Sequence, residues 1–403
     1  MKFRASWGQL GNENALGKYD FLARISSYND MYMGYVQGAG SNPWTGSIAR
    51  ALENRSLKWE TTDTKNIGFD FGLFGNHLNG NINYYINETR DLLITRRIAP
   101  SAGLDNPTLN VGKMRNQGFE LELNWNDKIS DFEYNVGFNI STIANKVVAL
   151  ANEDQTIYGV GLKYGTEHFP TQTKVGKPIG AFYLYQADGI FQSLEEVQAH
   201  KNSKGELLQP NAQPGDVRFK DMNGDGVIDE DDKTYSGTGI AKVEANLNLG
   251  ASYKGFDFSA VIGSAFGNKL YNGIRYYYEG MNSGSNFLKT TLNAWTPTNT
   301  KTDIPRAVFG DPNQNTREST RFLENGDFVR LRQVQLGYTL PKALSKHIYC
   351  ESIRFYVSAE NVFTITGYSG ANPEFSQGVL NSGVDRFTYP FSRSYTVGAQ
   401  VSF

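Results

Sequence analysis

The stretch Tyr395-Thr396-Val397-Gly398-Ala399-Gln400-Val401-Ser402-Phe403 alternates strictly between apolar residues and small or polar residues. Because successive side chains of a strand point to opposite faces, this pattern predicts a strand with one apolar and one polar face. The same alternation recurs upstream in segments 66–73, 119–125, 132–141 and 243–253. The chain is therefore expected to be all-β, with a sheet whose two faces differ.

Two architectures fit a two-faced sheet. A soluble β-sandwich hides the apolar face in its core, whereas a membrane β-barrel turns it to lipid and the polar face to a wet lumen. The alternating segments extend over roughly 10–15 residues, against about 5–6 for soluble strands and about 9–11 for spanning ones. We therefore predict a transmembrane antiparallel barrel. The residues expected to face lipid are Phe69, Phe71, Phe119, Leu121, Leu123, Leu247, Leu249, Val397 and Val401, and those expected to face the lumen are Glu120, Asn124, Asn135, Asn248 and Gln400.

Short and long connections alternate along the chain, as they do between the periplasmic turns and extracellular loops of outer-membrane barrels. Tight turns are expected near 75–78, 127–130, 176–180, 254–255 and 341–351. The segment 165–175 is placed as a strand partly because up–down parity requires it, and a change of phase between Leu331 and Val334 predicts a bulge. The expected strands, about twelve, are 2–11, 61–74, 77–97, 113–126, 131–146, 165–175, 181–191, 242–253, 256–266, 327–340, 351–364 and 392–403.

Composition excludes several classes of function. The 403 residues carry 39 Lys and Arg against 41 Asp and Glu, so no basic surface indicates nucleic acid. The single cysteine, Cys350, excludes a disulfide framework and is expected to be a shielded thiol. No nucleophile elbow, P-loop or H-E-x-x-H motif is present, so the chain is not expected to be an enzyme.

The long connection 192–241 contains two local motifs. Ser193 to Glu196 form a capping box, which predicts a short helix. Residues 221–232 read D-x-N-x-D-G-x-I-D-x-x-D, which is typical of a calcium loop with glycine at the sharp turn, here Gly226. A structural Ca²⁺ would be held by Asp221, Asn223, Asp225, the carbonyl of Val227, Asp229 and Asp232. The alternative is a solvated acidic turn.

Aromatic residues gather in the predicted outside loops and at the C-terminus. Aromatic faces stack on sugars or pack on peptides, which makes the loop rings candidates for ligand contact, although they could equally pack the loops together. The candidates are Tyr276, Tyr277, Tyr278 and Trp295, with Tyr368 and Phe375 nearby. The final strand, with Tyr395, Val397, Val401 and the terminal Phe403, matches an outer-membrane insertion signal.

Several spaced runs resemble the SusC/RagA family of TonB-linked outer-membrane proteins. They are L-K-W-E-T-T at 57–62 with N-I-G-F-D at 66–70, N-V-G-K-M-R-N-Q-G-F-E at 110–120, G-D-V-R-F-K at 215–220, and D-F-V-R-L-R at 327–332 with L-G-Y-T-L-P at 336–341. The resemblance extends over nearly all of the chain, residues 1–403, and the runs occur in the family's order.

The resemblance implies a place in the outer membrane of a bacterium and import of oligosaccharides or peptides. It implies a 22-stranded barrel, a SusD-like surface lipoprotein as partner, and energy from TonB. No signal peptide, TonB box or plug is recognised, so the chain is expected to be the C-terminal barrel part, with TonB contacted only through a preceding region. Two further hypotheses are a secreted calcium-stabilised β-protein, acting as an adhesin or glycan-binding module, and a surface enzyme acting on glycosides.

Overall fold

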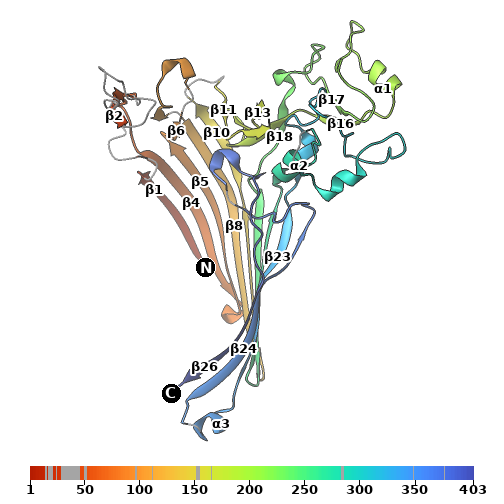
Figure 1. Ribbon diagram of the computed structural model, residues 1–403. Helices are drawn as coiled ribbons and strands as arrows, with labels where there is room; N and C mark the ends of the chain where they lie inside the picture. Colours follow the sequence, from red (N-terminus) through yellow and green to blue (C-terminus); the bar gives the residue numbers. More distant parts are fainter. Residues whose placement is uncertain are drawn as a thin grey trace, which may run out of the picture.

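The computed structural model of the chain shows two regions (Figure 1). A tall antiparallel sheet, which we call the wall, carries at one end a cluster of short strands, helices and loops, which we call the head. The residues that the structure describes are 1–13, 16, 21–23, 25–28, 46–49, 52–95, 98–110, 112–150, 155–164, 166–282, 286–347, 349–375 and 377–403.

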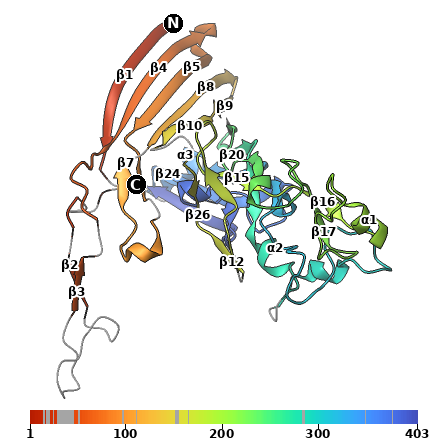
Figure 2. The ribbon, with the colours of Figure 1, turned by 90° about the horizontal axis from the view of Figure 1, so that it is seen from above.

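The wall is a single sheet of ten successive antiparallel strands, with one more strand paired to the side. Figure 2 shows it as an arc that runs from β1 to β26 and does not close. In spatial order the strands are β1 (Lys2–Asn12), β4 (Glu60–Leu73), β5 (Leu78–Arg90), β8 (Gly112–Ile129), β9 (Phe132–Thr142), β19 (Val243–Tyr253), β20 (Phe256–Phe266), β23 (Phe328–Thr339), β24 (Ser352–Thr366) and β26 (Ser394–Ser402). The side strand β10 (Ala144–Leu150) pairs with β8.

The strand register aligns side chains of one kind across the wall. Ile82 of β5 lies opposite Phe69 of β4 on one side and Leu121 of β8 on the other. One position along, Asn81 lies opposite Asp70 and Glu122. A slip of one residue would move every apolar side chain to the polar face, so the alternation in the sequence specifies this register.

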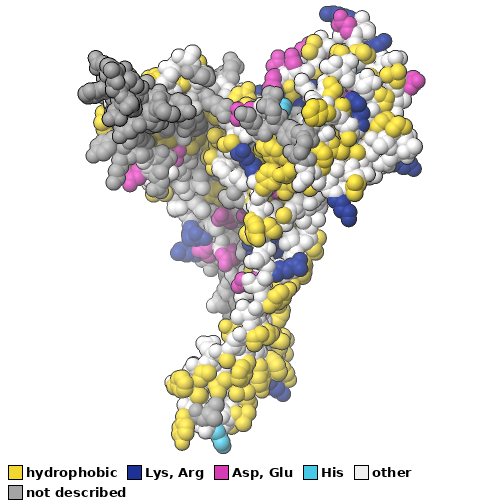
Figure 3. Space-filling view, in the orientation of Figure 1, with side chains coloured by type: hydrophobic (Ala, Val, Ile, Leu, Met, Phe, Trp, Pro, Cys, Tyr) yellow, Lys and Arg dark blue, Asp and Glu magenta, His cyan; other side chains and the backbone are white. Residues whose placement is uncertain are grey.

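The apolar face of the wall is not covered by a second sheet. Of the nine residues expected to face lipid, Phe119, Val397 and Val401 are exposed and the other six are half-buried. Figure 3 shows apolar side chains gathered over the lower part of the wall. The barrel prediction is thus confirmed and the sandwich interpretation is wrong. No helix among the described residues is both long and apolar enough to cross a membrane.

Tight connections lie at the end of the wall away from the head. They include the one-turn helix η1 (Phe74–Asn76), and the hairpin at Lys254-Gly255, whose φ angles of 44° and 86° suit a primed hairpin turn. The short helix α3 (Lys342–His347) follows β23. The bulge expected near Leu331 is confirmed, because the register of β23 with both neighbours shifts between Leu331 and Gln333.

Two of the twelve expected strands are not in the wall. β9 pairs directly with β19, with Thr142 opposite Val243, so nothing lies between them. Segments 165–175 and 181–191 instead form short head strands: β13 (Thr166–His168), β14 (Thr171–Thr173), β15 (Ala181–Leu184) and β16 (Ala187–Ile190). The expected tight turn at 176–180 also lies beside the head, where the Lys177 carbonyl accepts from the Val147 N–H at 2.9 Å. The alternation of strand direction could not reveal the error, because removing two neighbouring strands leaves the directions of all other strands unchanged. Residues 96–97 and 165 of the predicted strands lie outside the described residues.

The head has a hydrophobic core of its own. Two short hairpins lie at the same end of the wall but apart from the head (Figure 2): β2 (Ile25–Tyr28) with β3 (Gly46–Ala49), and β6 (Leu93–Thr95) with β7 (Thr108–Asn110), the second carrying the 3-10 turn η2 (Pro100–Ala102). The remaining strands of the head are β11 (Ile157–Tyr158), β12 (Leu162–Tyr164), β17 (Val217–Phe219), β18 (Thr234–Gly237), β21 (Lys269–Asn272), β22 (Leu323–Asn325) and β25 (Val384–Asp385). Its helices are α1 (Leu194–Ala199), α2 (Gly273–Tyr278) and the 3-10 turns η3 (Glu230–Asp232), η4 (Lys289–Asn293), η5 (Thr320–Phe322) and η6 (Val379–Asn381). One core cluster joins Leu162, Phe182, Leu184, Tyr271, Tyr276, Phe322 and Val384. These residues come from loops after different wall strands, so the loops fold as one unit.

Helix α1 begins where the capping box predicts. The Ser193 side chain accepts from the Glu196 N–H at 3.3 Å, and Glu196 Oε2 accepts from the Gln192 N–H at 2.9 Å. Cys350 is buried, as expected for a shielded thiol.

Candidate functional site: a charged cleft at the base of the head

The cleft begins where strand β21 turns into helix α2. Asn272 caps the helix, because its side-chain oxygen accepts from the Arg275 N–H at 3.0 Å. Its side-chain nitrogen donates to Glu324 Oε1 and to Ser369 Oγ, both at 3.0 Å. One turn along, Arg275 Nε donates to Glu279 Oε2 at 3.0 Å. The Asn272 side chain thus joins the connection between β20 and β23 to the one between β24 and β26, and the i,i+4 pair stabilises the end of α2.

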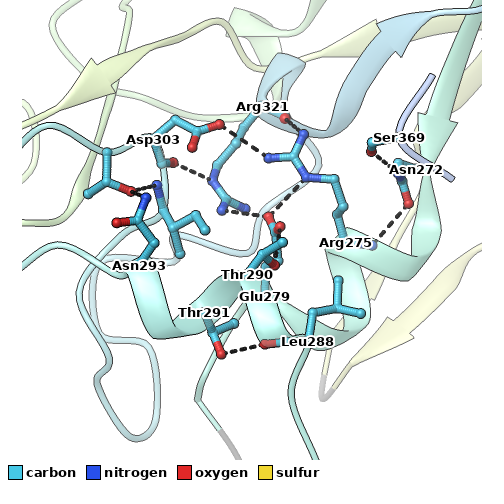
Figure 4. A network of polar contacts seen from close by, with 12 residues as sticks. Asn272, Arg275, Glu279, Leu288, Thr290, Thr291, Asn293, Asp303, Arg321 and Ser369 are labelled. Atoms are coloured by element: carbon cyan, nitrogen blue, oxygen red, sulfur yellow. Dashed lines mark hydrogen bonds and ion pairs between the residues drawn. The ribbon is translucent and has the colours of Figure 1, made fainter. Parts of the chain in front are cut away.

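Buried charges continue the network on the other side of Arg275 (Figure 4). Arg321 Nη2 donates to Glu279 Oε2 at 3.0 Å, so two guanidinium groups share one carboxylate. Arg275 also reaches Glu324 Oε1 at 3.2 Å and Asp303 Oδ2 at 3.5 Å. Burial lowers the pKa of Arg321 to about 10, with Glu279 opposing the shift, so Arg321 stays charged at neutral pH.

These residues line a cavity of about 640 Å³, which we call the Ser369 cleft. The residues that line this cleft include Asn272, Arg275, Glu279, Asp303, Glu324 and Ser369. A second cavity of about 500 Å³, the Arg218 cleft, is lined by Asp188, Glu196, Arg218 and Arg321 and also by Asp303. Because Asp303 borders both cavities, the two clefts adjoin.

The Arg218 cleft is less tightly paired than its neighbour. Arg218 Nη2 lies 3.3 Å from Asp188 Oδ2, and Nη1 lies 3.9 Å from Glu196 Oε2. The Arg218 Nε atom is buried and has no hydrogen-bond partner among the described residues. These two carboxylates therefore do not satisfy the Arg218 guanidinium group completely.

Two of the four candidate ligand-binding rings are buried. Tyr276 is 1% exposed in the head core, and Trp295 is 8% exposed, with its ring N–H donating to Gln192 Oε1 at 2.9 Å. These two rings pack the loops, which corresponds to the alternative role, and the ligand-contact prediction is not supported for them. Tyr277 and Tyr278 are half-buried and both contact the ring of Phe387. Ligand contact by these two stays a prediction.

Tyr368 and Phe375, the two neighbouring aromatic residues, are also largely covered. The Tyr368 hydroxyl donates to Asp385 Oδ2 at 2.7 Å, and burial raises its pKa. Phe375 is half-buried.

The acidic loop 221–232 folds around its own backbone. The Asp221 carboxylate accepts from the N–H groups of Gly224 and Gly226 at 2.6 and 2.9 Å. The fully buried Asp232 carboxylate accepts from the N–H groups of Met222 and Asp229 at 2.6 and 2.8 Å. Gly226 has a φ of 92°, which confirms the predicted left-handed turn.

Calcium binding by this loop stays a prediction. Asn223 Oδ1 accepts from the Asp225 N–H, and Asp225 Oδ1 from the Val227 N–H, both at 2.9 Å. Within the part of the chain that the structure describes, no three His, Cys, Asp or Glu side chains are grouped to share a metal ion. The oxygen donors that calcium prefers are present, but here they accept from N–H groups.

The residues of the predicted insertion signal lie along the last edge strand of the described wall. Tyr395, Val397 and Val401 belong to β26 and are exposed, as is Phe403 after it. Their pairing with β24, for example Val397 opposite Val357, leaves the other edge of β26 open. The signalling role itself stays a prediction.

Sequence reasoning missed the charged clefts. Arg275 and Glu279 stand four residues apart, which is a local signal for an ion pair on a helix. Nothing local connects them to Arg321, Glu324 or Ser369, because those residues reach the cleft only when separate loops pack together.

The comparisons with known proteins agree with this architecture. The family model described as "TonB dependent receptor-like, beta-barrel" matches residues 2–362. The chain therefore belongs to the TonB-dependent receptors, which are outer-membrane β-barrel proteins. Within this family it is similar to SusC and to RagAB, as the following comparisons show.

Curated relatives match along the whole chain. TonB-dependent receptor P3 of Formosa agariphila is 30% identical over 411 residues, which cover 100% of this chain and 39% of that protein. TonB-dependent receptor SusC of Bacteroides thetaiotaomicron is 27% identical, covering 100% of this chain and 37% of SusC. A solved structure, that of the RagAB peptide transporter, superposes with a TM-score of 0.78 and 26% identity, covering 100% of this chain and 40% of that one. The chain thus spans about two fifths of the length of these relatives.

Proposed function

We propose that the chain forms wall and extracellular loops of a TonB-dependent importer that takes up oligosaccharides or peptides through the outer membrane. The observation that carries this proposal is the match of wall and head together to the RagAB peptide transporter at a TM-score of 0.78. The wall would contact lipid with its apolar face, and the head would meet the nutrient outside the cell.

Partners follow from the same proposal. A SusD-like surface lipoprotein would cover the head, as the resemblance to the SusC/RagA family implies and as the similarity to SusC and RagAB supports. Energy would come from TonB through a region of the receptor outside the matched two fifths. Transport requires no bond to be made or broken, and the charged groups of the clefts are paired as ions instead of being arranged as a nucleophile beside a base.

The adhesin alternative is disfavoured by the wall. A secreted β-protein would have to keep the apolar rows of the wall in water, where exposed side chains such as Phe119 at 59% and Val397 at 83% would promote association. A membrane solvates those same side chains.

Uptake measurements test the proposal. A strain lacking the receptor gene, complemented with wild-type gene or with none, is supplied with labelled oligosaccharides and labelled peptides. We expect accumulation of at least one class only in the complemented strain, and its loss when TonB is absent. Equal accumulation with and without the gene, for both classes, would refute import by this receptor.

A further inference from the structure

The Ser369 cleft and the Arg218 cleft adjoin at Asp303 and together form one groove. Asp303 borders both cavities, and its side chain is 82% exposed even though one oxygen lies 3.5 Å from Arg275. Arg321, which underlies this point, is fixed by its bond to Glu279, and its Nε lies 3.4 Å from the Asp303 carbonyl. The exposed Asp303 carboxylate therefore lies between the two clefts, on a backbone segment that Arg321 holds in place.

The groove has an excess of negative charge. Five carboxylates line it against three guanidinium groups, and Lys220 Nζ, 3.4 Å from Asp188 Oδ1, supplies a fourth positive charge, which leaves one negative charge in excess. Glu279 is buried and Glu324 is half-buried, and both carboxylates are already bound by arginines or by Asn272 and Ser369. Asp303, Asp188 and Glu196 are not buried, with side-chain exposures of 82%, 45% and 41%. The groove thus presents three carboxylates to an incoming molecule, together with the Arg218 side chain, which is 33% exposed.

The uncharged part of the lining indicates the kind of molecule. Among the residues that the structure describes, no Phe, Tyr or Trp ring lines either cleft, although stacking on such rings is a usual way to hold sugars. The lining instead includes Ile274, Leu288 and Ile304. It also includes Gly367, where no atom lies within 4 Å of the position a β-carbon would take, which leaves the backbone open to approach. Apolar side chains beside an open backbone suit a peptide better than a glycan.

We propose that this groove binds a peptide segment carrying a basic group, a lysine or arginine side chain or a free amino terminus, with the cation against Asp303. This inference rests on the proposed import function and names its substrate class. The carboxylates of Asp188 and Glu196 would receive further basic or N–H groups of the same peptide on the Arg218 side.

Calorimetric titration of the full-length receptor in detergent micelles tests the groove. The probes are a Gly-Lys repeat peptide, its Gly-Glu counterpart and a maltooligosaccharide. The variant Asp303→Asn removes the exposed charge and keeps the shape, whereas Glu206→Gln removes an exposed head carboxylate that lines neither cleft. We expect the wild type to bind the Lys peptide in preference to the Glu peptide. Asp303→Asn should weaken Lys-peptide binding about tenfold, as loss of one charge-assisted contact predicts, and Glu206→Gln should leave it unchanged.

Three results would overturn the groove assignment: no Lys-peptide binding by the wild type, equal binding of both peptides, or equal affinity in wild type and Asp303→Asn. Binding of the maltooligosaccharide alone would also overturn it and would point to glycans. None of these results affects TonB-dependent uptake, which is measured in cells, so the import proposal stands or falls separately.

Discussion

The wall and the head obey different physical rules within one chain. Wall strands of 9 to 18 residues leave apolar side chains on an uncovered face, with Val397 at 83% exposure. The head buries Phe182, Tyr271 and Phe322 completely and encloses the charged Arg321 as well. The wall therefore depends on hydrogen bonds between strands and on lipid, whereas the head depends on a packed core and on ion pairs of its own.

The difference separates two kinds of sequence information. The residues of a wall strand are enough to identify it in the sequence, because successive side chains face an apolar and a polar environment in turn. A head segment is defined by whatever loop packs against it, so substitutions should act on the two regions differently.

The largest effect is expected from Phe182→Ala. Phe182 is fully buried beside Tyr271, so the change should lower the free energy of unfolding of the head by about 3–5 kcal/mol. Pulse proteolysis of the receptor in urea measures head stability, and heat-modifiable gel migration monitors the wall. The control Val397→Ala should leave head proteolysis unchanged, and equal sensitivity of both variants would contradict the separation of wall from head.

Glu279→Gln should rank next. The substitution removes the carboxylate that Arg321 pairs with and one of the three that Arg275 pairs with, and breaking such a buried pair costs about 3 kcal/mol. The same proteolysis assay measures the loss. Adding Arg321→Met to this variant should recover part of the stability, because it removes the uncompensated charge. If no stability is recovered, the unpaired charge of Arg321 is not the cause of the loss.

In the wall, Leu249→Arg tests lipid contact. Leu249 lies between Val136 and Ala260 on the apolar face, and an arginine there should cost about 2–4 kcal/mol near the bilayer midplane and less near an interface. Refolding into lipid vesicles gives the measurement. Asn248→Arg, one position along on the opposite face, should cost much less, and the reverse order would exchange the two faces.

The head should also weaken in acid through Glu318. Burial opposes ionisation of this carboxyl, but His168 and Lys233 favour it more strongly, and the pKa of Glu318 falls from 4.5 to about 2. Because the pKa is lower in the folded state, this carboxylate stabilises the head above about pH 4.5. That contribution is lost as the pH falls towards about 2. Proteolysis at graded pH should show a shallower slope for Glu318→Gln, and identical slopes would exclude the effect.

The smallest effect concerns the acidic loop. If Asp221, Asn223, Asp225, Val227, Asp229 and Asp232 hold Ca²⁺, calorimetric titration should give binding heat that Asp225→Ala removes, with Mg²⁺ substituting poorly. Metal loss should loosen the loop without affecting refolding of the wall. Equal, negligible heat from wild type and variant would leave a solvated acidic turn.

The prediction from sequence succeeded where the determinant was local. Ten wall strands, the bulge at Leu331, the helix after Ser193 and the turn at Gly226 follow from side-chain alternation, a cap and a glycine. The prediction failed for 165–191, where β14 and β15 are buried on both faces and carry no alternation. Without alternation in this segment, the prediction rested on the requirement that successive strands run in opposite directions. Ten strands satisfy that requirement as well as twelve.

Sequence alone determined the all-β fold, the two faces of the wall and its register, because period-two alternation sets the environment of each residue without reference to distant ones. Only the tertiary structure decided which aromatic rings are covered and which charges meet. Nothing in the sequence around Tyr276 or Trp295 distinguishes these buried rings from exposed ones. Arg275 meets Asp303 and Glu324 only because the long connection between β20 and β23 folds back on itself. Such contacts depend on loop closure in three dimensions, which no short-range pattern encodes.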